Sequence, residues 1–169
     1  MEQKPQIPSH FTPLPNNGTH GCFGCGPVNP HGLKMKFYSG DGALFSWLSV
    51  PQHLCGWDTL AHGGVLATIL DETMGWTAIH FLKKFALTNS MTLEYQKPVK
   101  IGEQIRVEGR VLEARGKREA KVEGLLYKEG DLLCVKAVGT FRLFTSAAIS
   151  RLGVIDKDSL KNFDFLIEP

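Results

Sequence analysis

The sequence predicts an α+β fold in which one long helix packs against a strongly curved, six-stranded antiparallel sheet. Three observations predict it: a proline-free stretch with helical periodicity, six stretches with strand periodicity around it, and short glycine-containing connections between the last strands. The chain has 169 residues, 43% of them hydrophobic, which is enough for one domain with its own core. A single helix must bury its apolar stripe, and one sheet wrapped around it is the economical solution.

Two strands are expected before the helix. Residues 1–21 are rich in proline and predict an extended or disordered arm. From residue 33 to 38 apolar and polar side chains alternate, which predicts a first strand. The turn formers at 39–42 predict a hairpin, and the alternation at 43–50 predicts its second strand.

The central element has a different period. From His62 to about Leu82 the chain contains no proline, and its apolar residues recur at intervals of three and four. They are Val65, Leu66, Ile69, Leu70, Thr73, Met74 and Thr77. This pattern predicts one long, largely buried helix.

Four more strands are predicted after the helix, at residues 86–96, 103–113, 118–127 and 132–143. The connections between the last three are too short to cross over, so these strands pair antiparallel as neighbouring hairpins. The order of elements predicts the hotdog fold, with a domain at 22–144 and a C-terminal appendage at 145–169. Because the sheet leaves part of the helix and its own edges exposed, we expect dimerisation.

Composition excludes several classes of function. The 19 Lys and Arg residues nearly balance the 17 Asp and Glu residues, so no strongly basic surface for nucleic acid is expected. The sequence has no apolar run of membrane-spanning length and no apolar signal segment at its start, so we expect no membrane contact and a cytoplasmic protein. It also lacks a serine elbow and a phosphate-binding loop, and the glycine spacing at 21–26 does not fit a dinucleotide site.

Cys22 and Cys25 form a C-x-x-C pair, which is found in zinc and redox sites. A zinc site needs further ligands, and from the sequence only His20, His31 or Cys55 could supply them. We therefore expect no metal and interpret the pair as a structural turn with free thiols.

The start of the helix is the most informative segment. Gly63 and Gly64 follow His62 and leave the first backbone N–H groups open, at the positive end of the helix dipole. An oxyanion could bind there. Asp71 lies about two and a half turns deeper, within the apolar stripe, where a carboxylate is unfavourable without a partner or a task. The alternative is that Asp71 or Glu72 simply faces solvent at a gap in the stripe.

Taken together, residues 22–143 resemble the hotdog-fold acyl-CoA thioesterases of the phenylacetate-pathway (PaaI-like) type. The resemblance depends on three motifs. They are His62-Gly63-Gly64 with Asp71, Thr88-x-x-Met91-x-Leu93-x-Tyr95-x-x-Pro98, and Cys22-Phe23-Gly24-Cys25-Gly26-Pro27-x-Asn29-Pro30-x-Gly32-Leu33.

The resemblance implies a role for each site residue. Asp71 takes the position of the catalytic carboxylate, as general base or as nucleophile. Gly63 or Gly64 takes that of the backbone oxyanion donor, and Thr88 supplies a hydroxyl that assists the water. His62 either orients the substrate or only caps the helix. The sequence departs from many relatives at Gly56, where they carry Asn or Gln.

The resemblance also implies an enzyme that hydrolyses an acyl-CoA thioester, working as a homodimer or a dimer of dimers. No cofactor is expected, since coenzyme A enters only as part of the substrate. The acyl chain length and its aryl or aliphatic nature stay open. Two other functions fit the sequence less well: an acyl-CoA sensor without turnover, and a hotdog hydratase suggested by Asn29-Pro30-His31 but lacking that signature's Asp.

Overall fold

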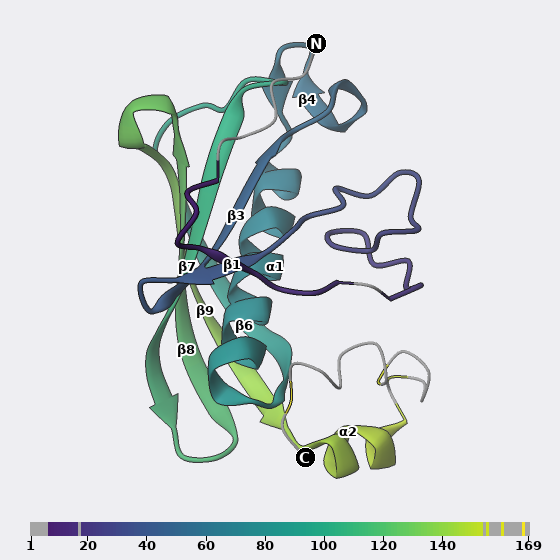
Figure 1. Ribbon diagram of the computed structural model, residues 1–169. Helices are drawn as coiled ribbons and strands as arrows, with labels where there is room; N and C mark the ends of the chain where they lie inside the picture. Colours follow the sequence, from purple (N-terminus) through teal and green to yellow (C-terminus); the bar gives the residue numbers. More distant parts are fainter. Residues whose placement is uncertain (1–6, 17, 154, 156–159, 161–166, 168–169) are drawn as a thin grey trace.

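The computed structural model describes residues 7–16, 18–153, 155, 160 and 167 (Figure 1). A seven-stranded antiparallel sheet curves around a long helix, in the order β1-β2-β3-β7-β8-β9-β6. Its strands are β1 (Thr12–Pro13), β2 (Tyr38–Gly40), β3 (Ala43–Ser49), β6 (Phe85–Tyr95), β7 (Gln104–Arg115), β8 (Glu119–Lys128) and β9 (Leu132–Phe144). The predicted hotdog fold is confirmed. The two-residue strand β1 adds a seventh strand to the six that were predicted.

The remaining elements are short except for the central helix. They are α1 (Gly63–Leu82), α2 (Ser146–Leu152), a small two-stranded sheet of β4 (Cys55–Trp57) and β5 (Leu60–Ala61), and the 3-10 turns Gln52–Leu54 and Glu129–Asp131. None of the helices in the described part of the chain has the length and apolar character needed to span a membrane.

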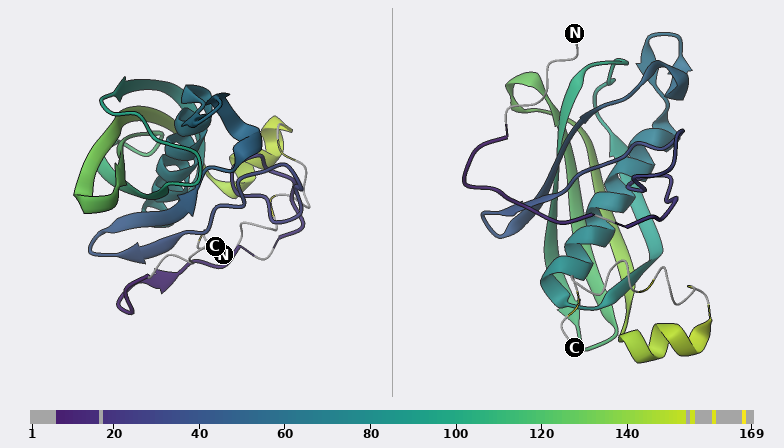
Figure 2. Two further views of the ribbon diagram at one scale, coloured as in Figure 1. Left: turned by 90° about the horizontal axis from the view of Figure 1, so that it is seen from above. Right: turned by 45° about the vertical axis from the view of Figure 1, so that its right-hand side comes forward.

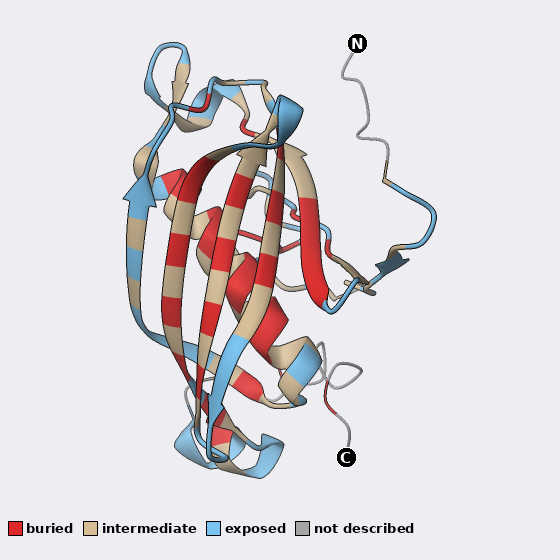
Figure 3. Ribbon diagram, turned by 90° about the vertical axis from the view of Figure 1, so that its left-hand side faces the viewer, coloured by how far each residue is buried: buried red, intermediate tan, exposed pale blue. Residues whose placement is uncertain are grey.

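Helix α1 agrees closely with its prediction. The His62 side chain caps its first turn, and Lys83 ends it in the left-handed conformation, with φ of 54°. Its buried residues are Val65, Leu66, Ile69, Leu70, Thr73, Met74, Trp76, Thr77 and Ala78. Viewed through the sheet, α1 is a column of buried residues behind the strands (Figure 3). The core therefore lies between α1 and the concave face of the sheet.

Close approach of α1 to the sheet depends on Gly109 in β7. A Cβ atom at this position would overlap the Thr77 hydroxyl and would lie 3.2 Å from the Thr73 carbonyl oxygen. Both threonines return their hydroxyls to the helix backbone, Thr73 to Ile69 at 2.8 Å and Thr77 to Thr73 at 2.6 Å. These buried hydroxyls are thus satisfied without a partner on the strand.

The first predicted strand is wrong over most of its length. Only residues 38–40 pair as a strand, because Lys34 adopts a positive φ of 50° and breaks the extended run. The Met35 N–H bonds instead to the Gly24 carbonyl at 3.0 Å. The predicted alternation still holds, since Met35 and Phe37 are buried. The segment buries its apolar face against the helix rather than within the sheet.

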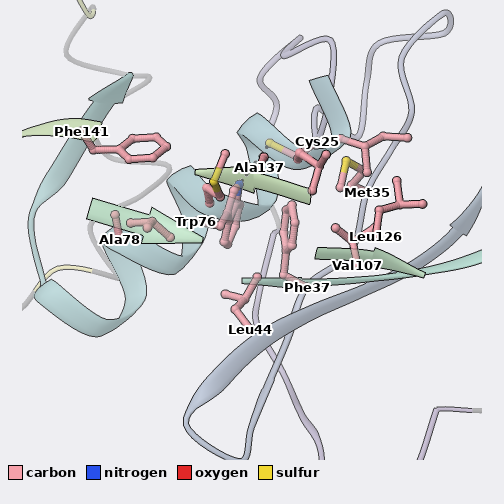
Figure 4. Packing of buried hydrophobic residues seen from close by; sticks show 14 of the residues in the cluster. Cys25, Met35, Phe37, Leu44, Trp76, Ala78, Val107, Leu126, Ala137 and Phe141 are labelled. Carbon is pink, nitrogen blue, oxygen red and sulfur yellow. Dashed lines mark hydrogen bonds between the residues drawn. The ribbon is translucent and has the colours of Figure 1, made fainter. Parts of the chain in front are cut away.

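That segment belongs to the lead-in, residues 14–16 and 18–37, which lies on the side of α1 opposite the sheet (Figures 1 and 2). The Phe37 and Trp76 rings stack there with centroids 4.6 Å apart (Figure 4). The sheet thus covers one side of the helix and the lead-in covers the opposite side (Figures 1 and 2).

Strand β6 forms one end of the sheet and pairs only with β9 among the described strands. Its middle is exposed from Thr88 to Ser90. Strand β6 is therefore an edge strand, with one row of backbone groups available for a further strand. The hairpin of β2 and β3 is also as predicted, since Asp41 and Gly42 turn the chain with positive φ.

Candidate active site

Asp71 and Thr88 form a hydrogen-bonded pair. The Thr88 hydroxyl donates to Asp71 Oδ1 at 2.7 Å. Asp71 comes from the middle of α1 and is half-buried, whereas Thr88 comes from the exposed edge strand β6. The carboxylate keeps its second oxygen for another partner, such as a water molecule. Two residues predicted for the site from separate motifs are thus brought together.

A β-bulge follows Thr88 immediately. The pairing of β6 with β9 skips from Thr88 to Ser90, so Asn89 is the extra residue. Ser90 and Asn89 then both contact the Thr140 hydroxyl, at 2.7 and 3.3 Å. Bulges re-aim the neighbouring side chains of a strand, and this one fixes the direction in which Thr88 points.

The start of α1 is arranged around His62. The Gly64 N–H donates to His62 Nδ1 at 3.0 Å, so the imidazole acts as the helix cap that was one of its two predicted roles. The Gly63 N–H donates to no other group in the described part of the chain. Tyr95 of β6 donates its hydroxyl to the Gly63 carbonyl at 2.9 Å and lies against this glycine. Of the two glycines, Gly63 is thus the open donor.

Gly56 packs against the same helix start. A Cβ atom there would lie 3.1 Å from His62 Cα, closer than ordinary van der Waals contact. The side-chain amide of Gln52, which lies nearby in the sequence, donates to the Asp58 carbonyl at 2.9 Å. Glycine at position 56 therefore fits the local packing, and no second amide faces Gly63 from this position.

The two halves of the predicted site are far apart within one chain. Gly63 and Asp71 are eight residues apart on one helix, which places them roughly 12 Å apart along its axis. A single thioester carbonyl needs its oxyanion donor and its attacking water within about 3 Å of the reacting atoms. One chain therefore does not bring both groups to one carbonyl.

A cavity of about 170 Å³ lies beside Asp71. Its walls are Cys22, Cys25, Asp71, Glu72, Gly75, Trp76, Ile79, Ala86 and Thr88. Of the aromatic side chains that could line an acyl site, Trp76 does so here. Phe45 and Trp47 stack on each other with centroids 5.6 Å apart, and Trp57 is 79% exposed.

Glu72 does not face solvent, contrary to the alternative considered for this acidic pair. It turns toward the lead-in, where Glu72 Oε1 and Cys22 Sγ share a hydrogen bond of 3.1 Å. Burial raises the pKa of Glu72 to about 8, and the neighbouring Cys22 sulfur adds to that shift. The Cys25 thiol donates to Cys22 and lowers the pKa of Cys22, while that bond and burial raise the pKa of Cys25.

Sequence reasoning offered Trp76 as a possible lining of an acyl site but missed the place of Glu72 in the cavity wall and the contact of Tyr95 with Gly63. A glutamate next to a candidate catalytic aspartate looks like an exposed helix residue unless the path of the lead-in is known. Tyr95 was part of a motif, but nothing in the sequence told that its hydroxyl reaches Gly63. His20, His31 and Cys55, the other zinc ligands considered, are not part of the cluster around Cys22.

Comparison with known proteins identifies a common family. Residues 59–135, which span α1 to the beginning of β9, match the thioesterase superfamily. A conserved protein from Pseudomonas aeruginosa is 31% identical, with a TM-score of 0.58, covering 66% of this chain and 90% of that one. No curated protein matches the chain.

More distant solved structures share the fold. A thioesterase superfamily protein is 23% identical with a TM-score of 0.64, and the match covers 69% of this chain but only 57% of that protein's length. The PaaI protein of the E. coli phenylacetic acid degradation operon is 16% identical with a TM-score of 0.60, over 66% and 80% of the two chains. A hypothetical thioesterase from Streptococcus pneumoniae, solved with coenzyme A, is 20% identical with a TM-score of 0.57, over 62% and 80%.

Proposed function

Because this chain belongs to the thioesterase superfamily, we propose that it hydrolyses an acyl-CoA thioester to the free acid and coenzyme A. The observation that carries the proposal is the pair of Asp71 and Thr88, joined at 2.7 Å on the wall of a cavity. A carboxylate oriented by a hydroxyl and open to a cavity is what activation of a water molecule requires. The coenzyme A held by the Streptococcus pneumoniae structure supports the substrate class.

The reaction needs little from the protein beyond these groups. In one route Asp71 accepts a proton from water as the water oxygen attacks the thioester carbonyl, and Thr88 orients that water or the carboxylate. The tetrahedral intermediate then breaks its C–S bond. Because a thiolate is a good leaving group, with an ordinary pKa near 8.5, no strong general acid is required. In the other route Asp71 attacks directly and water hydrolyses the resulting anhydride.

The oxyanion donor is the Gly63 N–H of a second chain. The helix start and Asp71 are too far apart within one chain to share a carbonyl. Strand β6 carries Thr88 and Tyr95 along an open sheet edge, so pairing two such edges would bring each Gly63 toward the partner subunit's site. The proposed active unit is therefore a homodimer, alone or within a dimer of dimers.

A basic groove supports a nucleotide-bearing substrate. It measures about 1050 Å³ and lies between α2, the end of β9 and the turn that joins β7 to β8. Its cationic side chains are Lys84, Lys117, Arg118, Arg142 and Arg151. The negatively charged phosphates of coenzyme A would form ion pairs with these cationic side chains. Arg115 lies outside this lining and pairs with Glu113 at 2.9 Å and with Glu119 at 3.6 Å, while Arg142 of the groove also pairs with Glu119, at 3.5 Å.

Release of free thiol from a panel of short, long and aryl acyl-CoA esters tests the proposal. The same acyl groups on pantetheine, which lacks the nucleotide, form the matched control. We expect turnover of at least one acyl-CoA, and a higher KM with little change in kcat for its pantetheine counterpart. Absence of thiol release across the panel would contradict the proposed thioesterase activity. Equal KM values for both carriers would overturn the role of the basic groove.

The second candidate is an acyl-CoA sensor that uses the same cavity without turnover. Within one chain, Gly63 and Asp71 are too far apart along α1 to act on one carbonyl. A monomeric protein would therefore favour the sensor. Such a protein would bind acyl-CoA stoichiometrically in equilibrium dialysis and release no thiol over hours. Cytoplasmic location and the domain bounds at 22 and 144 stay predictions.

A further inference from the structure

The lead-in brings two thiols and a carboxylate to one point beside α1. Cys22 Sγ, Cys25 Sγ and a Glu72 carboxylate oxygen all lie within 4.8 Å of one another. The Glu72 side chain reaches this cluster from α1, 50 residues away from Cys22 in the sequence. All three side chains line the cavity described above.

The turn around Cys22 is built to hold thiolates. The neighbouring backbone N–H groups of Cys25 and Gly24 help to lower the pKa of the Cys22 thiol, and the Gly26 N–H closes the turn on the Cys22 carbonyl at 2.9 Å. The indole N–H of Trp76 donates to Cys25 Sγ at 3.4 Å. N–H groups aimed at sulfur stabilise its anionic form and orient it, as outer-shell partners of metal ligands do.

Two glycines in this turn allow close contacts that a side chain would prevent. A Cβ atom at Gly24 would overlap the side chain of Glu72, and one at Gly26 would overlap the backbone of Cys22. The approach of the two cysteines to Glu72 therefore depends on both glycines. A loop that only covered the helix would not need contact this close with one carboxylate.

No cationic side chain is among the described residues that line the cavity of this cluster. The described residues that line its cavity include two thiols and the carboxylates of Asp71 and Glu72, but no Lys, Arg or His. Four groups that become negative on losing a proton thus face one small, half-enclosed space. Buried acidic groups are costly unless they are paired or coordinate a metal.

We propose that Cys22, Cys25 and Glu72 bind one thiophilic divalent cation of the zinc class, with its fourth position open toward the cavity. Two sulfurs and one carboxylate oxygen favour Zn²⁺ over Mg²⁺ or Ca²⁺, which prefer oxygen ligands only. Sulfurs bound to tetrahedral zinc at about 2.3 Å lie roughly 3.8 Å apart, a spacing compatible with the cluster as it stands. Binding displaces the thiol protons to solvent.

The proposal goes beyond thioester hydrolysis and does not depend on it. The open position faces the cavity that also holds Asp71 and Thr88, so a water molecule would complete the tetrahedron there. Bound metal would also tie the lead-in to the turn of α1 that carries Asp71. The ion is thereby expected to stabilise the folded protein as well as its site.

Cobalt titration of the full chain tests the site without any measurement of activity. The protein is stripped of metal under reducing conditions and Co²⁺ is added. We expect one equivalent to give the thiolate-to-cobalt charge-transfer band and the intense visible bands of a tetrahedral site, and Zn²⁺ to displace it. Competition with a chromogenic chelator then gives the Zn²⁺ affinity.

Matched variants assign the ligands. Cys22→Ser and Cys25→Ser should each weaken Zn²⁺ binding by more than the roughly 10- to 100-fold that loss of an outer-shell partner causes. Glu72→Gln should weaken binding while keeping the charge-transfer band, because both sulfurs remain. Cys55→Ser and Cys134→Ser alter the other two free cysteines and should change neither affinity nor spectrum.

Three results would overturn the proposal. They are absence of the charge-transfer band in the wild-type protein, unchanged Zn²⁺ affinity in Cys22→Ser, and a Cys22–Cys25 disulfide that persists in reducing buffer and excludes metal. If a serine variant fails to fold, as judged by circular dichroism, Glu72→Gln decides the question, since unchanged affinity in that variant would equally overturn the assigned ligand set.

Discussion

Thr88 on the edge strand β6 donates its hydroxyl proton to the Asp71 carboxylate on α1, across 2.7 Å. The two residues are 17 positions apart, and a helix end, a turn and a strand start lie between them. The bond fixes one carboxylate oxygen and leaves the other available toward the cavity. Asp71 is half-buried and Thr88 is exposed, so neither belongs to the fully buried core. Changes to this pair should therefore affect the chemistry of the site more than the stability of the fold.

Asp71→Asn should therefore remove turnover without unfolding the protein. The amide is nearly isosteric and its oxygen can still accept the Thr88 hydroxyl. We expect the free energy of unfolding to change by no more than about 1 kcal/mol, and kcat to fall by roughly 10²- to 10⁴-fold, the usual contribution of a general base. Urea denaturation and thiol release on the same preparation measure both.

Asp41→Asn provides the matched control for that substitution. Asp41 is an exposed residue in the β2–β3 turn, and Asn tolerates its positive φ. It should leave kcat unchanged. Full turnover in Asp71→Asn would show that the assigned carboxylate is wrong.

Thr88→Val separates an enzyme from a sensor. A hydroxyl that orients the attacking group acts more on the transition state than on binding, so kcat should fall with little change in KM. Loss of one neutral hydrogen bond corresponds to about 0.5–1.5 kcal/mol, or roughly threefold to tenfold in kcat. Thr92→Val, at an exposed position on the same strand, should leave both constants unchanged. An effect of Thr88→Val on ligand affinity alone would favour the sensor.

Local pattern predicted the fold well. The helix bounds and the hairpins depend on periodicity and on turn residues that act over a few positions, and both were confirmed. The first strand was wrong because Lys34 adopts a left-handed conformation that its residue type does not announce. The predicted alternation of buried and exposed side chains in this segment was still correct, because an extended segment packed on a helix can also bury every second side chain.

Site residues could be predicted from the sequence only where they were part of a recognisable family motif. Asp71 and Thr88 came from a family resemblance, and the structure then joined them. The contacts of Glu72 with Cys22 and Cys25 depend on how the lead-in folds back over α1, a long-range arrangement that no short pattern encodes. Trp76 was a possible lining residue from the sequence, but the hydrogen bond from its indole N–H to Cys25 depends on the same long-range arrangement.

Gly109→Ala should destabilise the fold through the packing of α1 on β7. The added methyl group overlaps the Thr77 hydroxyl and approaches the Thr73 carbonyl oxygen to 3.2 Å. Overpacking of this kind is expected to lower the free energy of unfolding by about 1–3 kcal/mol. Thr77→Ala removes the overlapping hydroxyl, so the double variant should be more stable than Gly109→Ala alone. Equal stability of the single and double variants in urea denaturation would contradict this account.

Gly63→Pro tests the oxyanion donor by deleting one proton. Gly63 is the first residue of α1, where proline fits a helix and its missing N–H breaks no helical bond. Removing one oxyanion donor is expected to lower kcat by about 10²- to 10³-fold. Gly63→Ala keeps the N–H, and its Cβ would make only ordinary contact with Tyr95 at 3.7 Å. Equal activity of the two variants would exclude the Gly63 N–H from the reaction.

The shared site makes a further prediction about mixtures. If Gly63 of one chain serves Asp71 of the other, a heterodimer of Gly63→Pro and Asp71→Asn has one site with both defects and one site with neither. Random assortment from equal amounts gives half heterodimers, so coexpression of the two inactive variants should restore about a quarter of wild-type activity per chain.

The same mixture distinguishes a shared site from a site within one chain. In the latter case every site would carry one defect, and the mixture would be as inactive as its components. Light scattering should show at least a dimer at assay concentration, and activity per chain should fall on dilution to where monomers dominate. A fully active monomer, together with no recovery in the mixture, would mean that Asp71 works with an oxyanion donor of its own chain and that Gly63 only begins the helix.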